Sequence, residues 1–152
     1  GIRLSPDRQR WYGEPCRESR RTFFRQTRGM RLDDLRDRTG AEPLSERLWR
    51  RYGRRAFEML DHIREDPSMA EDILGSSDYL RVELHNTAST EMIVHLDDFL
   101  RRRSKISLIT RQEDIQNSTG LSEVGSILFG ADAQTKLDEY FSSNSSPINP
   151  TK

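Results

Sequence analysis

The chain lacks the features that stabilise secreted or membrane-embedded proteins. It contains one cysteine, Cys16, among its 152 residues. It therefore cannot form an internal disulfide, and Cys16 has no second cysteine or histidine at a metal-ligand spacing. No apolar run approaches the ~20 residues that span a bilayer. The first residues also lack the pattern of a signal peptide. We therefore expect a soluble protein in a reducing, cytoplasmic setting.

The sequence also lacks the common motifs of enzyme active sites. It contains no GxGxxG, GxxxxGK[ST], HExxH or GxSxG pattern, so the usual evidence for dinucleotide, triphosphate, zinc and acyl chemistry is missing. His62, His85 and His95 are dispersed, which argues against a metal site. We predict no catalytic, cofactor-binding or metal-binding residue in this chain, which alone is not expected to be an enzyme.

One polar cluster could suggest proton transfer. His95, Asp98 and Glu91 can share one side of a helix. A structural or solvated polar face is the preferred interpretation, because such charged faces are common on surface helices.

Charge is plentiful but unevenly distributed. Hydrophobic and charged residues each make up 33% of the chain. Residues 1–55 contain 16 Arg and 8 Asp or Glu, a net charge of +8, whereas residues 56–152 carry −8. Arginine can bind carboxylates or phosphates through two parallel hydrogen bonds. The first third therefore suits either an anionic partner or an acidic surface of the same protein.

Residues 1–42 show little sustained apolar periodicity, and glycine and proline interrupt them. We expect an irregular, arginine-rich linker or arm. Its aromatic residues are unusual for a solvated tail and should pack either on this domain or on a missing neighbour. Trp11, Phe23 and Phe24 are predicted to mark the route into that neighbour, and Tyr12 is the fourth aromatic residue of the segment.

From residue 44 the apolar residues recur every three or four positions, which predicts an amphipathic helix up to about residue 63. Ser45 is the expected N-cap. Gly53 lies inside this run, so two helices that meet at Tyr52 and Gly53 are an alternative. Either way the helical segment should end before Asp66 and Pro67.

A second series of apolar residues, from residue 80 to residue 100, keeps a strict spacing of four. One straight helix cannot bury it, because the stripe drifts around the axis. We predict a helix capped by Ser76, Ser77 or Asp78, a break between residues 91 and 95, and a short helix over 96–103. Glu91 should form a buried ion pair with an arginine of the run 101–103, while other arginines of that run stay solvated.

Two further short helices are predicted over 121–129 and 137–141, with Gly130 as a stop signal between them. The Ser, Asn and Pro-rich residues 142–152 are expected to be disordered. The fold class is therefore all-α, a small bundle of about five or six short helices with an irregular N-terminal arm and a disordered C-terminal tail.

Several segments in this order resemble the C-terminal helical domain of FAD-dependent glycerol-3-phosphate dehydrogenases and alpha-glycerophosphate oxidases. The best motif is Leu96-Asp97-Asp98-Phe99-Leu100-Arg101-Arg102-Arg103. Supporting segments are Tyr79 to Glu83, Glu91-Met92, Arg47-Leu48, Arg51-Tyr52-Gly53, Glu65-Asp66-Pro67, Pro15-Cys16-Arg17 and Leu121 to Tyr140. The arginine-rich stretch 22–40 departs from the family pattern.

The resemblance implies a division into an arm (1–42), a helical C-terminal accessory domain (43–141) and a tail (142–152). It implies that a larger enzyme oxidises glycerol 3-phosphate to dihydroxyacetone phosphate with FAD, whose binding residues lie outside this chain. The FAD-binding module of the same polypeptide is the expected partner. Self-association is left open, and the parent enzyme can lie against the inner face of the membrane. The alternatives are a nucleic-acid-binding module, although no nucleic acid is expected, or a free-standing protein-interaction module.

Overall fold

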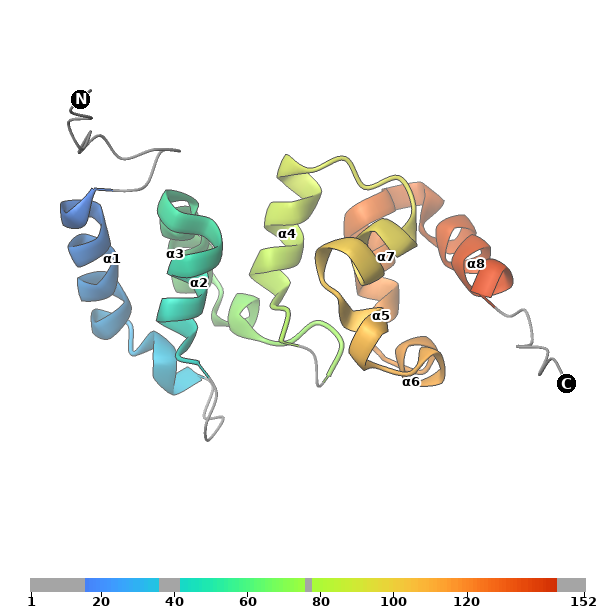
Figure 1. The fold of residues 1–152 in the computed structure, drawn as a ribbon, viewed down its shortest axis with the longest axis horizontal. Coiled ribbons are helices and arrows are strands. Elements are labelled where there is room, and N and C mark those ends of the chain that lie inside the picture. Colours follow the sequence, from blue (N-terminus) through green and yellow to red (C-terminus); the bar gives the residue numbers. More distant parts are fainter. Residues whose placement is uncertain (1–15, 36–41, 76–77, 145–152) are drawn as a thin grey trace, which may run out of the picture. The chain divides into compact units, whose positions relative to one another are not determined.

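The computed structural model describes residues 16–35, 42–75 and 78–144. Within those ranges the protein is all-α, as predicted (Figure 1). No strand occurs there, and an isolated β-bridge pairs Asp72 with Leu80. The chain divides into two compact units, residues 1–64 and residues 65–152. The domain boundaries at residues 42 and 141 stay predictions.

In its described residues, the first unit contains three helices and two short 3-10 turns. They are α1 (Arg17–Gly29), α2 (Leu44–Tyr52) and α3 (Ala56–Glu65), and the turns span Leu32–Leu35 and Gly53–Arg55. Helix α1 packs against α2 (Figure 1). The core of this unit is mainly apolar, as the spacing of residues 44–63 predicts, and Thr27, Ser45 and Arg47 are also buried.

Helix α1 corrects the expectation of irregular structure in this part of the chain. Cys16 caps its first turn, with Sγ accepting a hydrogen bond from the Ser19 backbone N–H at 3.4 Å. Arginine has a high helix propensity. The helix buries only Phe23 and Thr27, so its apolar stripe is too narrow to produce a recognisable period. The remaining residues of the predicted arm, 1–15 and 36–41, lie outside the described residues.

An aromatic cluster explains why α1 is held in place. The Phe23 ring lies 5.1 Å from Trp49 and 5.6 Å from Phe57, measured between centroids. Phe23 is fully buried and Phe24 is half-buried. The prediction that Phe23 marks a route into another module is therefore wrong, since it fills this unit's own core. Trp11 and Tyr12 lie outside the described residues.

The alternative of two helices meeting at Gly53 is confirmed. Gly53 adopts a φ of 53° between α2 and the next turn, a left-handed conformation that glycine reaches without steric cost. Ser45 is not the N-cap, which is Pro43. Instead the Ser45 backbone N–H and hydroxyl both donate to the Asp33 carboxylate, at 2.7 and 2.8 Å. A tertiary contact has taken over the local capping role.

The second unit contains helices α4 to α8. They are α4 (Arg81–Thr90), α5 (Ile106–Ile109), α6 (Gln112–Gln116), α7 (Leu121–Phe129) and α8 (Ala133–Asn144), and a π-helix, η5, spans Asp98–Arg103. Helix α7 packs against both α4 and α8. The core gathers side chains from nearly every element, with Leu84, Phe99, Leu100 and Val124 fully buried.

The predicted break after α4 is confirmed. Helix α4 ends at Thr90, and helical structure resumes at residue 96. The N-terminus of α4 is capped differently from the prediction, because its N-cap is Leu80 rather than Asp78. The buried Glu83 carboxylate accepts a hydrogen bond from the Leu80 backbone N–H at 2.9 Å. Ser76 and Ser77 lie outside the described residues.

Two glycines set the closing helices. Gly130 ends α7 with a φ of 56°, which confirms the predicted stop. Gly120, the N-cap of α7, lies so close to the segment before α4 that a Cβ there would collide with the carbonyl oxygen of Ile73. Helix α8 continues to Asn144, so residues 142–144 are helical and correct the expected start of the tail. Residues 145–152 lie outside the described residues.

Candidate functional site

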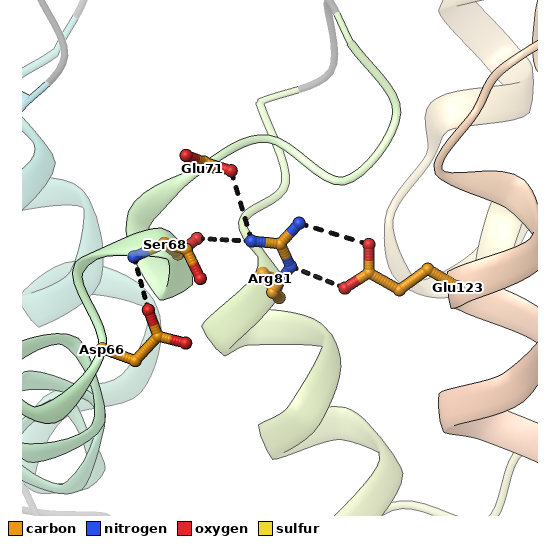
Figure 2. A network of polar contacts seen from close by, with 5 residues as sticks. All are labelled: Asp66, Ser68, Glu71, Arg81 and Glu123. Carbon is orange, nitrogen blue, oxygen red and sulfur yellow. Dashed lines mark hydrogen bonds and ion pairs between the residues drawn. The ribbon is translucent and has the colours of Figure 1, made fainter.

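Arg81 is the centre of a polar network in the second unit (Figure 2). Its Nε and Nη2 donate to the two carboxylate oxygens of Glu123 at 2.6 and 3.2 Å. Its Nη1 donates to the Ser68 carbonyl at 2.9 Å and to Glu71 Oε2 at 3.2 Å. One guanidinium therefore joins the segment at residues 67–71, the first turn of α4 and the first turn of α7.

The position of Arg81 argues that this network is structural. Arg81 is the first residue of α4, where the helix dipole disfavours a cation. The two carboxylates and the Ser68 carbonyl offset that cost, and Glu123 in particular raises the Arg81 pKa. Asp66 caps the same segment: its carboxylate accepts from Ser68, which lowers the Asp66 pKa. The spacing of Arg81 and Glu123 in sequence gave no signal for this pairing.

The three consecutive arginines differ in their contacts: two of them form ion pairs, whereas one was expected to. Arg103 Nη2 lies 2.9 Å from Glu91 Oε1, which confirms the predicted link across the break. The side chains of this pair are 36% and 35% exposed, respectively, so the prediction that the pair is buried is wrong. Arg102 binds Asp98 at 2.9 Å. Arg101 lines a groove instead.

The cluster of His95, Asp98 and Glu91 does not form a relay. The His95 backbone N–H donates to Asp98 Oδ2 at 3.0 Å, which is the main reason that the Asp98 pKa is lowered. The His95 ring lies 3.6 Å from the same carboxylate and is 65% exposed. Glu91 is engaged by Arg103. These groups therefore cap and pair the start of η5, consistent with a structural role.

Histidine-based metal chemistry finds no support in the described part of the chain. No group of three or more His, Cys, Asp or Glu side chains there could hold a metal ion. His62 and His95 are exposed and His85 is half-buried, on different elements. The same described residues contain no helix that is long and apolar enough to cross a bilayer.

A groove lies between η5 and α8 in the second unit. It has a volume of about 530 Å³, and its polar lining includes Arg101, Lys136 and Glu139. Lys136 Nζ already pairs with Glu139 at 3.0 Å. Burial raises the pKa of Tyr140, whose side chain forms part of the wall, so its hydroxyl is protonated at neutral pH and is not a base there. Sequence reasoning missed this groove because its walls come from separate elements.

The dinucleotide cradle of a flavin enzyme does not match this architecture. That cradle places a glycine-rich turn between a β-strand and a helix, which holds the pyrophosphate at the helix N-terminus. The described residues are helical and contain no strand. They do not form that cradle, and we assign none of the described residues to FAD.

Comparison with known proteins gives the family. Glycerol-3-phosphate dehydrogenase 2 from Mycobacterium bovis and from two strains of Mycobacterium tuberculosis is 30% identical to the chain over 93 residues, which cover 59% of the chain. The aligned segment is 16% of the length of those relatives, so the chain spans a small part of them. No solved structure matches the chain. The family model of the C-terminal domain of alpha-glycerophosphate oxidase matches residues 22–136. The chain therefore belongs to the family of the C-terminal domain of alpha-glycerophosphate oxidase.

Proposed function

We propose that this chain is the C-terminal accessory domain of an FAD-dependent glycerol-3-phosphate dehydrogenase. The observation that carries the proposal is the family match over residues 22–136. The mycobacterial relatives, named as glycerol-3-phosphate dehydrogenases, favour the same enzyme class. In the parent enzyme, glycerol 3-phosphate is oxidised to dihydroxyacetone phosphate, and electrons pass through FAD to a quinone or to oxygen.

The accessory domain itself is non-catalytic in this proposal. Many of its polar side chains are engaged in caps and ion pairs, such as the bidentate contact of Arg81 with Glu123. FAD and the substrate bind to the catalytic module of the same polypeptide. The parent enzyme acts in the cytoplasm, at or near the inner face of the membrane.

The role of the domain in this proposal is to pack against the FAD module. Met92 and Val94, in the loop after α4, and Ile109, at the end of α5, are 90%, 47% and 77% exposed. Apolar side chains at such exposure are suited to burial against another protein surface. Hydrogen exchange of the full-length polypeptide should show slower exchange in at least one of these segments than the isolated chain does. Equal exchange in both proteins would contradict the packing role.

The catalytic proposal is tested by glycerol-3-phosphate-dependent reduction of an artificial electron acceptor, with FAD added. The chain and the full-length polypeptide that contains it are compared at equal concentration. Activity in the full-length protein alone supports the proposal. Activity in the isolated chain contradicts the accessory role, and inactivity of a folded, FAD-loaded full-length protein contradicts the enzyme class. Full-length protein with Arg102→Met, a change at an exposed ion pair, is the matched control and should keep its activity.

A further inference from the structure

Helix α1 presents an unusual concentration of positive charge. Four arginines line one hollow of about 460 Å³ together with a single carboxylate and one aromatic ring. We call this hollow the arginine groove; it consists of Arg17, Arg20, Arg21, Phe24, Arg28 and Glu46. All of these residues belong to the first compact unit, so the groove is complete within it.

Three of the arginines and Phe24 recur on one face of the helix at successive turns. Residues 17, 21, 24 and 28 follow the spacings of four and three that align side chains on an α-helix. The distance along the axis from the first to the last is about 16 Å, at ~1.5 Å per residue. An extended peptide advances ~3.3 Å per residue. The groove therefore has the length of a segment of roughly five residues.

This arrangement costs stability in the free chain. Arg17 and Arg21 are like charges one turn apart, which is unfavourable. Arg17 also lies in the first turn of α1, where the helix dipole disfavours cations and where Glu18 is the sole acidic residue. Within the described residues, Arg20 pairs with Glu46 at 3.4 Å, whereas no ion pair engages Arg17, Arg21 or Arg28. An added anion would relieve this repulsion.

We propose that the arginine groove binds a carboxylate-rich segment of a partner polypeptide. Glu46 already shows the chemistry, because its carboxylate binds Arg20 inside the groove. The remaining guanidinium groups can each donate paired hydrogen bonds to a further carboxylate. The half-buried Phe24 offers an apolar contact that a polypeptide can use and inorganic phosphate cannot.

The surroundings of Phe24 favour a polypeptide over a nucleic acid. Binding of single-stranded nucleic acid relies on bases that stack on open aromatic faces. The guanidinium carbon of Arg20 lies 5.0 Å from the centroid of the Phe24 ring. Phe23 and Trp49 contact the same ring at centroid distances of 5.4 and 6.3 Å. A base would have to displace Arg20, whereas carboxylates can bind the arginines without moving it.

Fluorescence anisotropy of the whole chain with a labelled oligoglutamate peptide tests the proposal at low ionic strength. The triple variant R17Q/R21Q/R28Q should bind about tenfold more weakly or worse. The affinity of R17K/R21K/R28K should lie between those of the wild type and the glutamine triple variant, because lysine keeps the charge but loses the bidentate geometry. The matched control, R25Q/R54Q/R55Q, removes the same charge from the same unit outside the groove and should bind within about twofold of the wild type. Circular dichroism and urea midpoints establish that every variant is folded.

The remaining outcomes overturn the proposal. Equal weakening in both glutamine triples would mean that net charge, not the groove, attracts the peptide. Tighter binding of a single-stranded oligothymidylate of equal charge, or efficient displacement by tripolyphosphate, would assign the groove to phosphates. If the peptide does not bind at low ionic strength, the groove is not a site for acidic segments. None of these results bears on the dehydrogenase assay, so the two proposals fail separately.

Discussion

Removal of the Arg81 guanidinium is the sharpest test of how the second unit is held together. Arg81→Met keeps the aliphatic stem but deletes the contacts to Glu123, Ser68 and Glu71. A hydrogen bond to a charged group contributes ~1.5–3 kcal/mol when it is shielded, whereas an exposed ion pair contributes ~0.2–1 kcal/mol.

The exposed fractions of the side chains determine how much each Arg81 contact contributes, between the values for a shielded and for an exposed pair. The side chain of Arg81 is 21% exposed and that of Glu123 is 36% exposed, whereas that of Glu71 is 66% exposed. Glu71 therefore adds little, and the Glu123 contacts must be discounted for solvent screening. We expect Arg81→Met to lower the free energy of unfolding by about 2 kcal/mol, and Arg81→Lys by about 1 kcal/mol, because lysine cannot form the planar fork.

Urea unfolding followed by far-ultraviolet circular dichroism measures this loss. With a denaturant slope of ~2 kcal/mol/M, Arg81→Met should move the midpoint down by about 1 M without changing the slope. A double-mutant cycle with Glu123→Gln should give a coupling of about 1 kcal/mol. Arg102→Met is the control: it removes an arginine from an exposed pair of the same unit and should cost less than ~0.5 kcal/mol. If Arg81→Met behaves like the control, or the coupling is below ~0.3 kcal/mol, the network does not stabilise the fold.

Three further changes test other parts of the structure. Gly120→Ala should lower the free energy of unfolding in urea by about 2 kcal/mol or more, because the new Cβ meets a backbone carbonyl. Gly29→Ala, where the space around the glycine is open, should leave stability unchanged or raise it by up to ~1 kcal/mol. Equal effects of the two substitutions would contradict the close approach at Gly120. Glu91→Gln should cost less than ~1 kcal/mol, because its pair with Arg103 is more than one-third exposed; a loss of several kcal/mol in thermal unfolding would show that the pair is shielded. Burial raises the pKa of Tyr140 in the folded protein above its value of ~10 in the unfolded chain. The neutral hydroxyl therefore contributes its full stabilisation below the unfolded-state pKa. That stabilisation is lost as the pH rises through the folded-state pKa. Tyr140→Phe should reduce the alkaline loss of stability, and an unchanged urea midpoint profile across alkaline pH would refute the assignment.

The sequence by itself determined the fold class, the break after α4 and the bounds of α7, whereas α5 and α6 were not predicted. The strict spacing of four between residues 80 and 100 cannot remain on one face of a straight helix, so the break after α4 could be derived from it. Gly130 and Gly53 signalled helix ends because glycine alone adopts left-handed φ values at little cost. The link between Glu91 and the arginine run followed from placing opposite charges across that break. These are local properties, encoded within a few residues.

Tertiary structure decided the remainder. Helix α1 could not be predicted from periodicity, because its exposed face is rich in arginine and it buries only Phe23 and Thr27. An aromatic cluster holds this helix in place instead of a regular apolar stripe. Asp33 caps the amide of Ser45, and Glu123 binds Arg81, from positions 12 and 42 residues away. No local pattern specifies such partners, because several carboxylates in each unit could have filled the same role. The choice among them is made when the helices pack, since packing alone sets which side chains lie within hydrogen-bond distance.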